Sequence, residues 1–156
     1  MNERSVTHST FVIERVFDAT PEQVFGAWAD PVVKRRWFSG PSEWEQGPHE
    51  LDFRVGGRER ASGGPAEGPK HLYEAIYQDI VPNQRVVYSY VMHLDGRKIS
   101  VSLSTMELKP AGASTRMIYT EQGAYLDGFD HPAEREHGSR ELFDKLALLL
   151  HEAVKP

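Results

Sequence analysis

Hydrophobic and polar residues alternate along much of this chain, in short runs that predict β-strands. The first run, residues 11–17, places Phe11, Ile13 and Phe17 on one side of a strand. The second half of the chain contains four more such runs, at residues 71–81, 85–94, 98–108 and 115–122. Asp95-Gly96 separates two of them and is typical of a tight β-hairpin.

Helix signals interrupt this pattern near both ends of the chain. Thr20, Pro21 and Gln23 form a capping-box sequence that starts a first helix, and Asp30-Pro31 starts a second, shorter one. A final helix is predicted over residues 132–154, where apolar side chains recur at helical spacing. The residues of this apolar stripe are Phe143, Leu146, Ala147, Leu150 and Val154.

The segment between the second helix and the later strands gives weaker signals. Residues 39–48 are rich in Gly and Pro and predict a loop. Residues 49–55 predict a strand, and residues 61–69 predict a mobile hairpin tip. The order of elements is typical of a single α+β domain over residues 1–156, with a long helix packed on an antiparallel sheet of about six strands.

Composition limits the classes of partner. The 156 residues contain 18 Lys and Arg against 23 Asp and Glu, a balance that argues against nucleic acid as a partner. The basic run Lys34-Arg35-Arg36 is interpreted as a solvated helix face. With no Cys, disulfides and thiolate chemistry are excluded. No apolar run approaches the roughly 20 residues that span a bilayer, and no signal peptide is recognised, so we expect a cytoplasmic protein.

Aromatic residues recur on alternate positions of the predicted strands. Tyr73 and Tyr77 share one side of a strand, and Tyr88 and Tyr90 share one side of the next. They either form a core under the last helix or line a pocket, in which Tyr supplies both apolar surface and a hydroxyl. A dry core of several tyrosines is costly, because each buried hydroxyl needs a partner. The predicted ligand-binding residues are Trp37, Phe38, Trp44, Phe53, Tyr73, Tyr88, Tyr90, Met92, Tyr119, Glu121 and Phe143.

Glu121 is the candidate for acid-base chemistry. It shares a strand side with Met117 and Tyr119, so its carboxylate either points toward the helix or lies in water at the strand end that Gly123 suggests. The same pattern allows an ion pair between Arg15 and Glu121.

Metal and cofactor motifs are missing from the sequence. His131, Glu134 and His137 include one Glu-x-x-His spacing, whereas a di-iron bundle needs two copies, so no metal is expected. No phosphate loop, dinucleotide fingerprint or nucleophile elbow occurs, and no cofactor is expected.

Several motifs together resemble one superfamily. The first reads R-x-F-D-A-x-P-E-x-V-F-x-A-W-x-D-P and occupies residues 15–31; the second reads D-x-R-x-G-G-R and occupies residues 52–58. Gly138, Phe143 and Leu146 resemble a C-terminal G-W-x-x-x-L-D-x-L pattern, with Ser139 in place of the usual Trp. The chain resembles the START-like, helix-grip superfamily called SRPBCC, in its branch related to the activator of the heat-shock protein 90 ATPase.

The resemblance implies a sheet that curls around the long helix and leaves a cavity, with Trp28, Trp37 and Phe38 on the helices above it. Three functions stay open. The first is binding of a small hydrophobic, amphipathic or aromatic molecule. The second is polyketide cyclase or hydrolase chemistry by Tyr hydroxyls and Glu121, and the third is stimulation of a chaperone ATPase. Ligand binding is favoured over catalysis, because no catalytic motif is present, and a homodimer is left open.

Overall fold

The computed structural model describes residues 3–154, so residues 1–2 and 155–156 of the predicted domain lie outside the described part. The three helices in this part are α1 (Pro21–Ala29), α2 (Pro31–Trp37) and α3 (Pro132–Val154). Its strands are β1 (Val6–Phe17), β2 (Glu45–Leu51), β3 (Arg58–Gly64), β4 (His71–Val81), β5 (Arg85–Leu94), β6 (Arg97–Ala111) and β7 (Ser114–Leu126).

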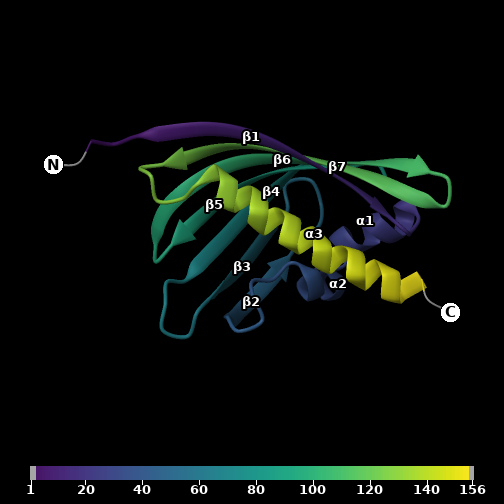
Figure 1. Ribbon diagram of the computed structural model, residues 1–156, viewed down its shortest axis with the longest axis horizontal. Coiled ribbons are helices and arrows are strands. Elements are labelled where there is room, and N and C mark those ends of the chain that lie inside the picture. The colour runs from purple at the N-terminus through teal and green to yellow at the C-terminus, as the bar shows by residue number, and fades with distance from the viewer. Residues whose placement is uncertain (1–2, 155–156) are drawn as a thin grey trace.

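All the strands belong to one antiparallel sheet in the order β1-β7-β6-β5-β4-β3-β2. The sheet is curved, and α3 runs diagonally across one of its faces, with α1 and α2 near one end of that helix (Figure 1). α1 contacts β6, β7 and α3, whereas α2 contacts β2 and α3. This arrangement is the predicted α+β helix-grip fold, in which the core lies between the sheet and the helices.

The helix starts confirm the sequence signals. The hydroxyl of Thr20 accepts a hydrogen bond from the Gln23 amide at 3.2 Å, and the Gln23 side chain accepts one from the Thr20 amide at 2.8 Å. The Asp30 carboxylate accepts hydrogen bonds from the amides of Val32 and Val33 at the start of α2. Both helices therefore satisfy amides that have no partner inside the helix.

The sheet has seven strands rather than about six, because residues 61–64 belong to β3 and not to a mobile tip. Ala61 pairs with Tyr73 and Gly63 with His71 across β4, while β2 covers the other edge of β3. Backbone hydrogen bonds on both sides hold this segment as a strand although its glycines disfavour one. The predicted strand over residues 49–55 is also displaced: β2 begins at Glu45 and ends at Leu51.

Candidate functional site

A cavity of about 850 Å³ lies between α3, the loop before β2 and the inner face of the sheet. Its wall includes Trp28 of α1 and Ser139 of α3, neither of which was among the predicted binding residues. It also includes all of the predicted binding residues except Phe53: Trp37, Phe38, Trp44, Tyr73, Tyr88, Tyr90, Met92, Tyr119, Glu121 and Phe143. The fold thus brings these side chains to one cavity, and their contact with a ligand stays a prediction.

Phe53 lies in a different part of the core. Its ring packs edge-on against Phe25 at a centroid distance of 5.5 Å and against Tyr77 at 4.9 Å. Because β2 ends at Leu51, Phe53 belongs to the turn before β3 and not to a strand that faces the cavity. Phe53 is therefore not among the residues that line this cavity.

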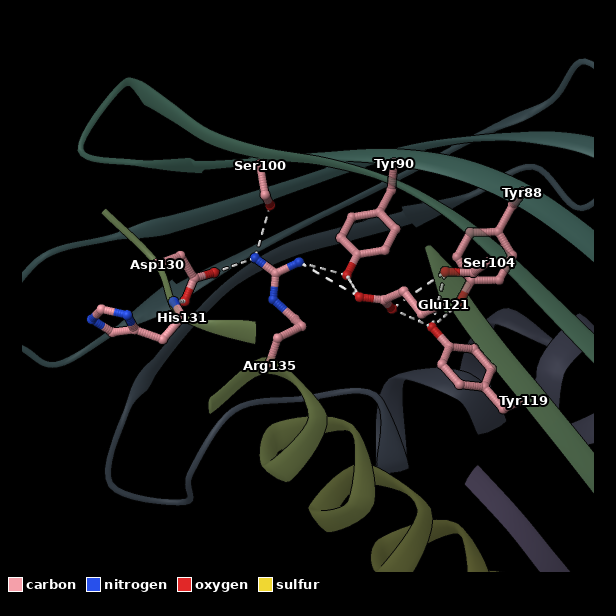
Figure 2. A network of polar contacts seen from close by, with 9 residues as sticks. All are labelled: Tyr88, Tyr90, Ser100, Ser104, Tyr119, Glu121, Asp130, His131 and Arg135. Carbon is pink, nitrogen blue, oxygen red and sulfur yellow. Dashed lines mark hydrogen bonds and ion pairs between the residues drawn. The ribbon is translucent and has the colours of Figure 1, made fainter. Parts of the chain in front are cut away.

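Glu121 occupies the centre of a polar network on the inner face of the sheet (Figure 2). Its side chain is 1% exposed, and the hydroxyls of Tyr119 and Tyr90 donate to its two oxygens at 2.6 and 2.8 Å. Ser104 adds a longer hydrogen bond of 3.3 Å. The alternative that places Glu121 in water is wrong, because β7 continues past Gly123 to Leu126.

Arg135 of α3 supplies the positive charge beside this network. Its guanidinium donates to the Tyr90 hydroxyl at 2.7 Å and to the Ser100 hydroxyl at 2.8 Å, and it forms an ion pair with Asp130. One of its nitrogens lies 3.8 Å from the Glu121 carboxylate (Figure 2). The guanidinium thus ties the first turn of α3 to β5, β6 and β7 at one end of the cavity.

The Arg15–Glu121 pair that the sequence allowed is absent. Arg15 instead donates to Asp144 of α3 at 2.7 Å. The register explains the difference, because β1 places Phe11 beside Glu121 and Arg15 beside Met117, which lies four residues before Glu121 in β7.

Burial and charge keep the phenols of this network protonated. Burial raises the pKa of Tyr119 and Tyr90 well above the ordinary value of 10.0, and the nearby Glu121 carboxylate raises both further. Burial alone lowers the pKa of Arg135, but Tyr90, Asp130 and Glu121 outweigh it and the pKa is raised. At neutral pH the phenols are hydrogen-bond donors and Arg135 is a cation.

A second polar cluster, formed by Lys34, Glu59, His49 and Tyr77, is buried outside the cavity wall. The Lys34 ammonium donates to Glu59 at 2.5 Å, the Tyr77 hydroxyl donates to Glu59 at 2.7 Å, and His49 contacts the other Glu59 oxygen at 2.7 Å. The ammonium also lies 4.7 Å from the centre of the Phe38 ring. Lys34 is fully buried, so the interpretation of the basic run as a solvated face is wrong at this residue.

Acid is expected to destabilise the protein through Glu59. Burial raises the pKa of Glu59, but the Lys34 ammonium and hydrogen bonds from His49, Lys34 and Tyr77 outweigh it and lower the pKa from 4.5 to about 2. A folded-state pKa below the unfolded value stabilises the fold above pH 4.5, and this stabilisation is lost as the pH falls toward 2. The difference corresponds to about 3 kcal/mol.

Urea unfolding at pH 6, 4 and 3, followed by Trp fluorescence, measures this loss. A Glu59→Gln variant is expected to be less stable at pH 6 and to lose less stability on acidification. An equal loss in both proteins would show that Glu59 does not carry the effect.

The described residues contain no group of three or more His, Asp or Glu side chains placed to hold a metal ion. His137, one of the histidines near the start of α3, lies 2.9 Å from Glu141 one turn further along the helix. Within residues 3–154, none of the helices is long and apolar enough to cross a membrane.

The sequence patterns predicted most aromatic residues of the cavity wall but not the charged residues of the two buried networks. Lys34 precedes Trp37 by three residues and shares its side of α2, which is a weak signal of burial. Glu59 and Arg135 carry no comparable signal, since each lies in a segment rich in charged residues. Their roles depend on pairings between distant segments of the chain.

Comparisons with known proteins place this fold and sequence in one family. Residues 18–151 match the family described as activator of Hsp90 ATPase homolog 1-like protein. A protein from Rhizobium leguminosarum is 41% identical, with a TM-score of 0.92 and coverage of 97% of this chain and 99% of that one. The protein Mll3558 from Rhizobium loti is 46% identical, with a TM-score of 0.86 and coverage of 94% and 99%.

An AHSA1-like protein from Aeromonas hydrophila shares the fold at 21% identity, with a TM-score of 0.71 and coverage of 93% of this chain and 94% of that one. A search of curated proteins gave no match. The family match spans most of the chain. The two rhizobial structures are similar to this chain over nearly their full length. The chain therefore belongs to the family of activator of Hsp90 ATPase homolog 1-like proteins.

Proposed function

We propose that this protein binds a small hydrophobic or amphipathic molecule in the cavity between the sheet and α3. The observation that carries the proposal is the cavity itself, which has a volume of about 850 Å³ and nine Trp, Tyr and Phe residues in its wall. Pockets of roughly 300–1,000 Å³ with apolar walls and a few polar groups are typical of small-molecule sites. The fold is also one in which ligand binding is common.

The polar network gives the cavity two chemically different regions. Trp37, Phe38 and Phe143 provide an apolar surface near α2 and the middle of α3. Glu121 and Arg135 lie near the start of α3, where they are held by tyrosine and serine hydroxyls. A molecule with an apolar body and a polar end would therefore bind in one orientation.

Native mass spectrometry of the protein purified from its own host tests this proposal. A small molecule that stays bound after purification, and whose removal lowers the melting temperature, is the expected result. A protein that carries no such mass and shows no thermal shift with apolar aromatic compounds would contradict it.

Catalysis on the bound molecule is a second candidate, favoured by the position of Glu121. The carboxylate lines the cavity next to the hydroxyls of Tyr90 and Tyr119, as an acid-base site for a polyketide-type substrate would require. The molecule identified by mass spectrometry distinguishes the two functions. Prolonged incubation with the purified protein leaves a carried ligand unchanged and converts a substrate.

A further inference from the structure

Among the four tyrosines that line the cavity, Tyr73 differs from the others in its hydroxyl. Tyr90 and Tyr119 donate to Glu121, and Tyr88 shares a contact of 3.3 Å with the Tyr119 hydroxyl. The Tyr73 hydroxyl is buried and has no hydrogen-bond partner within residues 3–154. A buried polar group without a partner costs free energy and calls for a specific explanation.

Two more orphaned polar atoms occur in the wall of the same cavity. The indole nitrogen of Trp28 and Nδ1 of His71 are buried and have no partner within the described part of the chain. The indole N–H can only donate, and burial raises the pKa of Tyr73 well above 10.0, so its hydroxyl also keeps its proton. The wall therefore contains unused donors, which call for an acceptor on the ligand.

The charges of the cavity indicate that this acceptor is uncharged. The Lys and Arg residues of the lining are Arg135 and Lys145, and both already have hydrogen-bond partners, Lys145 the carbonyl oxygens of Ser39 and Gly40. An anion would meet a net negative wall and no free cation, which disfavours its binding. The acidic residues of the lining are Glu43, Glu121, Asp130, Glu134, Glu141 and Asp144.

We propose that the ligand is an uncharged ring compound with a carbonyl-type oxygen that accepts a hydrogen bond from the Tyr73 hydroxyl. This inference rests on the proposed function and adds the chemical class of the ligand. The Tyr73 ring packs edge-on against Phe38 and at a tilt against Tyr90, each at a centroid distance of 4.9 Å, so the hydroxyl belongs to an aromatic cluster whose rings can pack against a ring compound. The hydroxyl is buried in the free protein, so a ligand reaches it only when neighbouring side chains shift.

Three compounds with the same tricyclic skeleton test the inference by equilibrium dialysis: fluorene, 9-fluorenone and fluorene-9-carboxylate. Water solvates the ketone better than the hydrocarbon, so burial of apolar surface alone favours fluorene. A hydrogen bond from Tyr73 is expected to reverse this order and to make 9-fluorenone bind about tenfold more tightly than fluorene. The carboxylate is expected to bind more weakly than the ketone.

Tyr73→Phe removes the hydroxyl and keeps the ring. We expect it to weaken binding of 9-fluorenone about tenfold and to leave binding of fluorene unchanged. Tyr125→Phe is the matched control, because Tyr125 is not among the residues that line the cavity. Because Tyr73→Phe removes an unpaired polar group, the melting temperature of this variant should not fall. Weaker binding of the ketone can then be assigned to the lost hydrogen bond and not to unfolding.

The outcomes distinguish failure of this inference from failure of the proposed function. Equal binding of the ketone and the hydrocarbon, tightest binding of the carboxylate, or a ketone preference that survives Tyr73→Phe would overturn the inference and leave the binding function intact. Failure of all three compounds to bind would contradict the proposed apolar binding site itself.

Discussion

Replacement of Lys34 with Met is expected to lower the free energy of unfolding by about 3–5 kcal/mol, although Met fits the same space. The Lys34 ammonium and the Glu59 carboxylate are both fully buried and lie 2.5 Å apart. Loss of the ammonium leaves a buried carboxylate with only His49 and the Tyr77 hydroxyl as partners. The uncompensated charge, more than any lost packing, causes the destabilisation.

Two further variants identify the ion pair as the cause. Arg35→Met alters the next residue of α2, which is exposed, and should change stability by less than about 0.5 kcal/mol. The double variant Lys34→Met with Glu59→Leu removes both charges and should recover much of the loss, because a buried ion pair and an apolar pair of similar size are often equally stable. If urea unfolding shows the same stability for the double variant and for Lys34→Met, the uncompensated charge is not the cause.

The fold was predictable wherever one short stretch of sequence determines one element. The capping residues Thr20 and Asp30 fixed the starts of α1 and α2, and alternation gave the bounds of β4 and β5 correctly. β3 was missed because its glycines and its serine have little intrinsic preference for a strand. Its conformation is imposed by β2 and β4 on either side, and local sequence does not contain that information.

The aromatic residues of the cavity wall were predictable from alternation along single strands. The charged residue that contacts Glu121 was not. Alternation places Tyr88 and Tyr90 on one side of β5, and both lie on the inner face in the structure. The cation beside Glu121 was not predicted, because it is Arg135 of α3 and not Arg15 of the neighbouring strand β1. Parity alone allowed Arg15, and only the register of β1 on β7 excludes it.

The two buried ionic clusters have different relations to the cavity. Lys34 and Glu59 do not line it, so their pairing acts on stability and on the position of α2 against β3. Glu121 and Arg135 do line it, and they hold the start of α3 against the sheet. Variants of Lys34 or Glu59 should therefore change the free energy of unfolding but not the affinity for a ligand. Variants of Glu121 or Arg135 should change both.

Replacement of Ser139 with Trp is expected to block the cavity and to weaken binding of 9-fluorenone or fluorene about 100-fold, equivalent to about 2.7 kcal/mol. Ser139 is 8% exposed and lies in the cavity wall on α3. The C-terminal pattern that this chain resembles has Trp at this position, so the helix should accept the indole, which would fill space that a ligand needs. Arg140→Trp is the control, because Arg140 is exposed and is not a residue of the wall. It adds the same side chain and should leave binding unchanged. A Ser139→Trp protein that melts no lower than the native protein and still binds these compounds with native affinity would place the binding site outside this cavity.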